Sequence, residues 1–216
     1  MPWGKNLIEA ILHTPEKIPS QKMTFYYTAR EAYNKDYDQD GMSWQKYIEF
    51  SRLSHLTELV SVDGMLNEVL VEPDHDNADD WNYIVVDNDY STGFFTSMDY
   101  VLKKIKPIDR FNLLAVVIEP PQDCKFITIE DFEFVGYDLI DKDYSISALT
   151  NCGGFDETFL PSDLNIFGLL DDYYKAFDTK NRLLENNPDE HHADTNVIAI
   201  WRHKTIGRKK HTLLEV

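Results

Sequence analysis

The chain has 216 residues, of which 43% are hydrophobic and 13% aromatic, a composition typical of a folded domain and unlike that of a disordered chain. Lysine and arginine number 21, against 38 for aspartate and glutamate, which gives a formal net charge of −17. A field of that sign repels phosphates and anionic lipids. It argues against direct nucleic-acid binding and membrane-surface binding, and it favours a basic protein partner.

Length and cysteine content set further limits. A chain of this size buries enough surface to fold without a disulfide or a metal ion, so no cofactor is expected. Cys124 and Cys152 could form one bridge, but nothing requires it. The longest apolar run, residues 113–118, is too short to cross a bilayer, and residues 1–5 do not open a signal peptide. We therefore expect a cytoplasmic protein; its oligomeric state stays open.

The first half of the chain predicts three helices and one strand. Residues 5–13 have the composition of a short helix that stops before a proline. Over residues 43–56, aromatic and aliphatic side chains recur at helical spacing, which predicts an amphipathic helix. Residues 81–86 have the pattern of a strand closed by turn residues. A hydroxyl side chain at 96–97 can cap a helix that runs to residue 105, with lysines near its C-terminal end.

The second half predicts three strands, a further pairing segment and a long helix. The apolar run within residues 111–121 indicates a central strand buried on both faces. Residues 132–141 alternate as a half-buried strand does, and residues 145–151 could pair with them across a turn. An apolar stripe predicts a helix over 161–187. A final strand is expected over 196–201.

These elements predict an α+β fold, with a mainly antiparallel sheet and helices packed on one face. We expect a single domain over residues 1–201. Residues 202–216 are rich in lysine and arginine, and we expect them to form a basic tail that frays.

One acidic segment resembles part of a calcium-binding loop. Asp36, Asp38 and Asp40, followed by Gly41, match its first half, in which alternate carboxylates and a turn glycine surround the ion. The second half does not match, because Tyr47 stands where the loop needs a bidentate glutamate. An exposed acidic turn before the next helix is therefore the preferred interpretation, and a calcium site is the alternative.

Cys152 is the only candidate nucleophile that we consider. It follows a predicted strand segment and precedes Gly153 and Gly154, so nearby backbone N–H groups could activate the thiol and stabilise an oxyanion. A small buried thiol at a Gly-Gly turn is the simpler explanation. We therefore expect no enzymatic activity and keep a cysteine-dependent enzyme as an alternative.

Acidic residues gather in three stretches, at 72–89, 119–143 and 156–194. Aromatic residues lie among the acids of the first and third stretches, and aromatic anchors within a charged rim are typical of interface hot spots. The predicted partner-binding residues are Asp79, Asp80, Trp81, Tyr83, Asp87, Asp89, Asp171, Asp172, Tyr173 and Tyr174.

Three segments carry a resemblance to known proteins. They are WQKYIEFSRLSHLTELVSVDGML (44–66), LLAVVIEP (113–120) and FVGYDLIDKDYSISALTNCGGF (134–155). Together they resemble a family of uncharacterised bacterial proteins of roughly this length, loosely associated with immunity roles in toxin systems. The resemblance spans the middle of the chain and implies an inhibitor, without implying any catalytic residue.

The residues and the resemblance lead to one functional hypothesis. We expect a non-enzymatic acidic binding protein, in its concrete form an immunity-type inhibitor that neutralises a basic toxin, for example a nuclease. Complementary charge would speed the encounter, and buried aromatic side chains would slow release. The alternatives are a nucleic-acid mimic that inhibits a DNA-binding protein, and the enzyme that uses Cys152.

Overall fold

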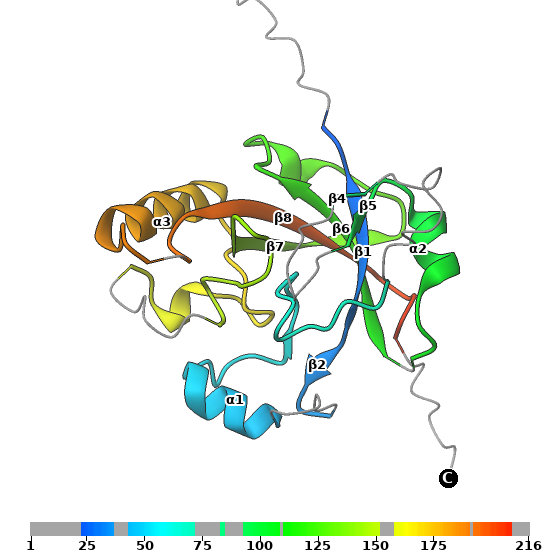
Figure 1. Ribbon diagram of the computed structural model, residues 1–216, viewed down its shortest axis with the longest axis horizontal. Helices are drawn as coiled ribbons and strands as arrows, with labels where there is room; N and C mark the ends of the chain where they lie inside the picture. The colour runs from blue at the N-terminus through cyan, green and yellow to red at the C-terminus, as the bar shows by residue number, and fades with distance from the viewer. Residues whose placement is uncertain are drawn as a thin grey trace, which may run out of the picture.

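The protein is built around an antiparallel sheet of six strands in the order β4-β5-β1-β6-β8-β7 (Figure 1). The computed structural model describes residues 23–36, 43–71, 83–84, 93–108, 110–151, 158–190 and 192–208. The strands are β1 (Tyr26–Glu31), β4 (Tyr83–Ile84), β5 (Phe94–Phe95), β6 (Phe111–Ile118), β7 (Phe132–Asp141) and β8 (Thr195–His203). The predicted α+β class with an antiparallel sheet is confirmed.

The strand β6 lies inside the sheet, between β1 and β8, as its apolar run predicts. Leu113, Ala115 and Val117 face one side, and Leu114 and Val116 face the other. None of these five side chains is more than 4% exposed. A strand that is apolar on both faces needs a covering layer on each side, and the two layers are built differently.

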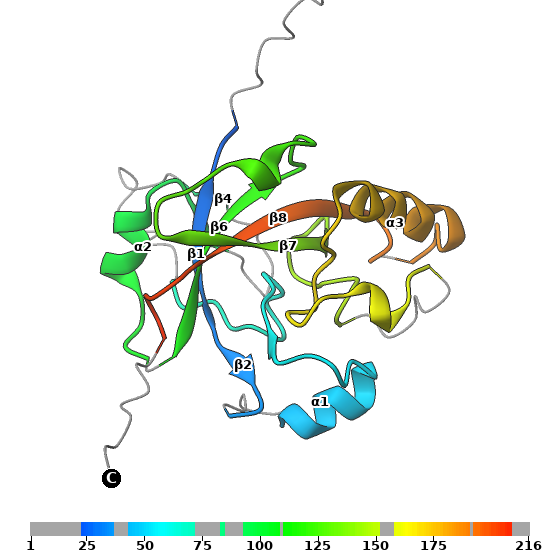
Figure 2. The same ribbon diagram turned by 180° about the vertical axis from the view of Figure 1, so that it is seen from behind.

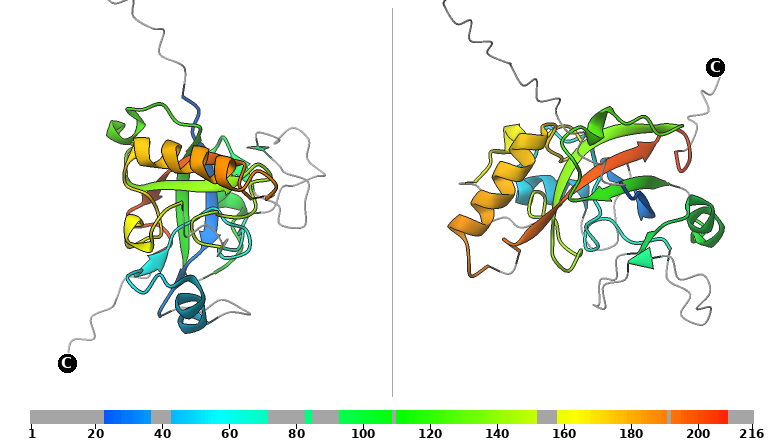
Figure 3. Two further views of the ribbon diagram at one scale, coloured as in Figure 1. Left: turned by 90° about the vertical axis from the view of Figure 1, so that its left-hand side faces the viewer. Right: turned by 90° about the horizontal axis from the view of Figure 1, so that it is seen from above.

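Helices cover one face of the sheet. α2 (Met98–Lys104) contacts β1 and β5, and α3 (Tyr173–Asn186) contacts β7 and β8 (Figures 1 and 3). Val101 of α2 and Ala176 and Leu183 of α3 are fully buried in one apolar cluster with this face. The prediction that helices pack on one face is therefore confirmed.

Irregular chain covers the opposite face (Figure 2). Val60, Val62 and Leu169 are buried there against apolar side chains of β6 and β8. Its only regular pairing among the described residues is a short two-stranded sheet of β2 (Tyr33–Asn34) and β3 (Glu58–Leu59). Elsewhere this layer makes single backbone hydrogen bonds to neighbouring segments, such as Val60 N–H to the Phe167 oxygen, and buried side chains add the polar clusters described below.

The helix α1 (Trp44–Ser51) lies beyond β2 and packs ring to ring, with Trp44 and Tyr47 against Tyr33. Ser43 caps its first turn, as an N-terminal serine is suited to do. Arg52 then adopts a left-handed conformation with φ 61°, which ends the helix. The helix predicted over 43–56 is confirmed at its start and ends earlier than predicted.

The helix predicted over 161–187 is wrong in its first part. Pro161–Asp163 form one 3-10 turn, η3, and Gly168 has a left-handed φ of 82° that no helix contains. Asp172 caps α3, which begins only at Tyr173. The apolar residues before Gly168 follow helical spacing but cover the sheet from a loop.

The segment 145–151 forms one bridge to β7, between Ser147 and Ile140, instead of the predicted strand pairing. The carboxylate of Asp141 accepts a hydrogen bond from the backbone N–H of Ser145, 2.8 Å away. Beyond the bridge the chain enters a turn, in which the Leu149 N–H donates to the Ser147 hydroxyl and not to β7, and the pairing stops there.

The remaining predicted elements have mixed outcomes. Ser97 caps α2 by accepting from the Tyr100 N–H, 3.2 Å away, as predicted. Of the strand predicted at 81–86 the structure describes two residues, and the helix predicted at 5–13 lies outside the described residues. β8 continues past Trp201, and Arg202 is only 4% exposed, so the predicted boundary before residue 202 comes too early for the sheet.

The edge strand β7 is closed by the irregular layer. Tyr137 and Leu170 exchange two backbone hydrogen bonds, of 2.8 and 2.9 Å. The register to β8 shifts between Phe134 and Gly136, where Gly136 has φ 142°. A Cβ atom at Gly136 would lie 2.6 Å from the Leu169 Cβ, so only glycine fits this close approach.

We predict that Gly136→Ala destabilises the protein by about 2–4 kcal/mol, because the methyl group meets Leu169 and the left-handed backbone strains any L side chain. Urea unfolding followed by circular dichroism measures the effect. A variant as stable as the wild type would show that β7 and Leu169 do not approach this closely.

Candidate functional site

Among the predicted binding residues whose side chains the structure describes, Tyr174, in the first turn of α3, is the most exposed aromatic residue. Its side chain is 62% exposed. Its hydroxyl accepts a hydrogen bond from Gln122 Nε2, and its ring meets the Tyr173 ring edge-on at 5.5 Å. Tyr173 is half-buried and in turn contacts Phe177, 4.6 Å between ring centroids. The Tyr174 ring is therefore exposed to a partner while its orientation is held from two sides.

A stripe of side chains continues from Tyr174 along the outer side of α3. Phe177 and Leu184 follow at intervals of three and seven residues, which places them on the same helix face. Phe177 is partly buried and Leu184 is 44% exposed. The neighbouring 3-10 turn η2 (Cys124–Phe126) carries Phe126, which is 77% exposed, and its segment contacts α3 through Gln122. We call Gln122, Tyr174, Phe177 and Leu184 the α3 surface.

The charges around the α3 surface are predominantly negative. Each cation of α3 is in an ion pair with an acid of this chain: Lys175 with Asp163, Lys180 with Glu119 and Arg182 with Asp178. Asp171 and Asp172 lie at the start of the helix, and both are exposed. Because the helix cations are already matched, a basic partner would meet an excess of carboxylates here.

The structure brings together four of the predicted partner-binding residues, Asp171, Asp172, Tyr173 and Tyr174. They differ in role: Asp172 caps α3 by accepting from the Lys175 N–H at 2.9 Å, and Asp171 accepts from Asn165 Nδ2 at 2.7 Å. Tyr173 faces inward, so Tyr174 is the exposed aromatic residue of the four.

Of the other predicted binding residues the structure describes only Tyr83. Tyr83 is in β4, and β4 and β7 are the two edges of the sheet, whereas α3 contacts β7 and β8. Tyr83 and the α3 group therefore lie toward different edge strands of the sheet. The remaining predicted positions lie outside the described residues: Asp79, Asp80, Trp81, Asp87 and Asp89.

Most of the weaker sequence candidates lie outside the described residues. Asp36 is exposed, and its carbonyl oxygen accepts from Arg110 Nη1 at 3.4 Å, while Asp38 and Asp40 lie outside the described residues. No group of acidic, histidine or cysteine side chains within the described part of the chain could hold a metal ion. Cys152 also lies outside it.

The cysteine that the structure does describe, Cys124, is fully buried, and its sulfur lies 3.6 Å from the Tyr137 hydroxyl. Burial raises the pKa of this thiol, which keeps it protonated and unreactive at neutral pH. Cys124 is therefore a core residue and gives no nucleophile.

Two buried aspartates join β7 to the irregular layer. Asp138 of β7 accepts hydrogen bonds from the hydroxyls of Ser61 and Ser147. Asp63 accepts from the Ser147 N–H at 2.8 Å and from Asn151 Nδ2 at 3.0 Å. Both carboxyl groups are 0% exposed. Burial is the main cause that raises the pKa of Asp63 and brings that of Asp138 to about 6.

Paired carboxyl groups with raised pKa values can act as acid and base in enzymes. Here both are fully buried and bonded to groups of the chain itself, so a substrate cannot reach them without opening the layer. We interpret the pair as a structural tie between β7, residues 61–66 and residues 147–151.

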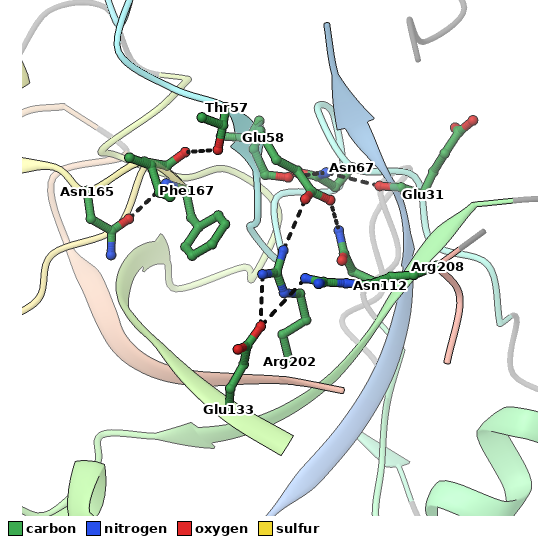
Figure 4. A network of polar contacts seen from close by, with 12 residues as sticks. Glu31, Thr57, Glu58, Asn67, Asn112, Glu133, Asn165, Phe167, Arg202 and Arg208 are labelled. Carbon is green, nitrogen blue, oxygen red and sulfur yellow. Dashed lines mark hydrogen bonds and ion pairs between the residues drawn. The ribbon is translucent and has the colours of Figure 1, made fainter. Parts of the chain in front are cut away.

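A second polar cluster surrounds Arg202 of β8 (Figure 4). Its guanidinium donates to Glu58 at 3.0 Å and to Glu133 at 2.9 Å, and it stacks on the Phe167 ring, 4.4 Å from the centroid. Asn112 Nδ2 donates to the other oxygen of Glu58 at 2.9 Å. The charge of this nearly buried arginine is paired with two glutamates of the chain. These contacts hold the irregular layer against the sheet.

Reading the sequence did not identify these polar clusters. One signal was present: a carboxylate, Asp138, interrupts the apolar pattern of 132–141, although the shift after Phe134 places it on the face opposite to Phe132 and Phe134. A carboxylate at an inward position of a strand indicates a buried partner. The partners themselves, such as Ser61 and Ser147, are far away in the chain and carry no local pattern.

The raised pKa of Asp138 predicts a pH dependence of stability. Its pKa rises from the usual 3.8 to about 6 on folding, so the folded protein binds this proton more tightly than the unfolded chain does. Stability therefore falls as pH rises from about 4 to about 6, by at most about 3 kcal/mol from this group. We predict a shallower fall in Asp138→Asn, measured by urea unfolding at a series of pH values. An unchanged slope would contradict the assignment.

Asp163→Asn provides a control with the opposite sign. Burial tends to raise the pKa of Asp163, but the hydrogen bond and charge of Lys175, 2.5 Å away, outweigh it and lower that pKa. The stability that this carboxylate contributes is present above its unfolded pKa near 4 and is lost at lower pH. The variant should therefore be uniformly less stable between pH 4 and 6, with the wild-type slope.

Comparisons with known proteins were made for the whole chain. No protein-family model matches it, and no curated protein or solved structure is significantly similar to it. None of the described helices is long and apolar enough to cross a membrane. The functional conclusion therefore depends on the residues of the site.

Proposed function

We propose that this chain is a non-enzymatic acidic binding protein that takes a basic protein partner on the α3 surface. Its concrete form is an immunity-type inhibitor of a basic toxin, for example a nuclease with a cationic substrate cleft. The observation that carries the proposal is Tyr174, whose ring is 62% exposed yet held by Gln122 and Tyr173. An aromatic residue that is ordered before binding loses little entropy in a complex, which is a property of interface hot spots.

Charge supports the same choice of partner. The chain carries a net charge of −17, and the cations of α3 are already paired with acids of the chain. Such a surface accelerates the encounter with a basic protein and repels acidic ones.

A nucleic-acid mimic is less well supported. A mimic needs carboxylates in place of phosphates along its binding face. On the outer side of α3 the corresponding positions carry Tyr174, Phe177 and Leu184, an apolar stripe suited to a protein surface. An enzyme that uses Cys152 stays an alternative, because Cys152 lies outside the described residues; Asp63 and Asp138, fully buried and bonded within the chain, offer no accessible acid–base pair.

The test uses the partner that the full chain captures from its native host, purified and measured by surface plasmon resonance. We predict that Tyr174→Ala weakens binding by about 30-fold or more, mostly through faster dissociation, as expected when a hot spot worth about 2 kcal/mol is lost. The matched control is Phe50→Ala, which removes an aromatic ring that is 56% exposed on α1. The control should bind within about twofold of the wild type.

A charge variant tests the long-range electrostatic attraction separately from the direct contact of Tyr174 with the partner. Asp171→Lys combined with Asp178→Lys should slow association and reduce its dependence on salt, because both carboxylates are exposed beside the stripe. Two results would contradict the proposal: a captured partner that is itself acidic, or a basic partner whose binding neither Tyr174→Ala nor the charge variant changes.

A further inference from the structure

A cluster of buried polar atoms without hydrogen-bond partners lies between β1 and the irregular layer. Within the part of the chain that the structure describes, these atoms are Thr28 Oγ1, Arg30 Nε, Arg30 Nη2 and Asn67 Oδ1. All three residues are 0% exposed. A buried donor or acceptor that stays unpaired destabilises a fold, so a set of four in one place calls for a physical explanation.

The hydrogen bonds of Arg30 show which of its donors lack a partner. Its Nη1 donates to the backbone oxygen of Asn67 at 3.3 Å. The two unpaired donors, Nε and Nη2, lie on one edge of the planar guanidinium and point the same way. Burial lowers the pKa of Arg30 to about 10, and the negative charge of Asp63 offsets only part of this effect. The group is charged at neutral pH, with one complete edge unpaired.

The unpaired oxygens belong to two residues that adjoin Arg30 in the fold. Thr28 is two residues before Arg30 in β1, so both side chains project from the same face of the sheet. Asn67 donates through its Nδ2 to the backbone oxygens of Glu31 at 3.1 Å and Leu59 at 3.3 Å (Figure 4). These two bonds fix the amide and leave Oδ1 as an acceptor that needs a donor.

We propose that ordered water is a structural ligand of this cluster, bridging the Nε–Nη2 edge of Arg30 to Asn67 Oδ1 and Thr28 Oγ1. Water is the small ligand that accepts from a guanidinium and donates to an amide oxygen at the same time. Buried waters typically make about three such bonds, which the four unpaired atoms can supply. Within the Arg30 guanidinium, direct hydrogen bonds to residues 58–71 reach only Nη1. The water bridge links the other edge of the guanidinium to these residues.

An inorganic anion fits the cluster less well. It would accept from Arg30, but it cannot donate to Asn67 Oδ1, and the net charge of −17 opposes its entry. A carboxylate would leave the same acceptor unpaired. The combination of leftover donors and leftover acceptors is what selects water.

Nuclear magnetic resonance of the full-length chain tests the proposal. The Nε–H signal of Arg30, assigned by its loss in Arg30→Lys, should show a dipolar cross-peak to water, with opposite signs in the laboratory and rotating frames, as a long-lived water gives. Arg182, whose side chain is 46% exposed, is the control and should lack such a cross-peak. Exchanging chloride for another anion should leave the Arg30 signal in place.

A crystal structure that resolves ordered water gives the second measurement. The expected result is a solvent peak about 2.7–3.2 Å from Nε or Nη2 of Arg30 and also within reach of Asn67 Oδ1 or Thr28 Oγ1. An anion or a carboxylate of the chain on that edge would overturn the proposal. So would an Arg30 signal that moves with the anion, or one without a water cross-peak.

Discussion

The fold depends on how an irregular layer satisfies its backbone over a sheet. A helix bonds its own N–H and C=O groups, but residues 58–71 and the described parts of 145–170 do so only in short turns. Some of these groups bond to the backbone of a neighbouring segment, as Val60 does to Phe167, and carboxylates and amides supply further partners. Asp63 accepts two backbone N–H groups from its own turn and one from Ser147. The side chains of Asn165 and Asp138 likewise form hydrogen bonds with backbone groups of β7. The polar interior of this acidic protein is therefore a requirement of its architecture.

This difference between the layers explains what the sequence could predict. The run at 111–118 and the alternation at 132–141 are local signals, and they correctly identified a central strand and a second strand, although the second is buried on both faces from Val135 onward and not half-buried. The helical spacing within 161–187 was equally regular before Gly168, yet that part is a loop, because its apolar side chains pack on the sheet. Periodicity reports which side chains are buried and does not distinguish a helix from an irregular segment that buries the same ones.

The candidate site likewise has features that the sequence predicts and features that it does not. Asp171 to Tyr174 could be found from the sequence, because an aromatic pair directly after two acids is a local pattern. The exposure of Tyr174 and the inward position of Tyr173 could not, since they depend on where α3 begins and on Gln122, far away in the chain. The separation of β4 from α3 is likewise a matter of strand order, which no local pattern contains.

The closed edge at β7 has a consequence for how the protein can associate. Tyr137 and Leu170 use each other's backbone groups, and Asn165 Nδ2 donates to the Val135 oxygen at 2.8 Å. These contacts occupy backbone groups through which an added strand would pair, so the central part of this edge does not template a continuous intermolecular sheet. A partner on this side of the molecule meets side chains instead of a backbone ladder. The affinity for such a partner then depends on individual side chains, so a single substitution can change it.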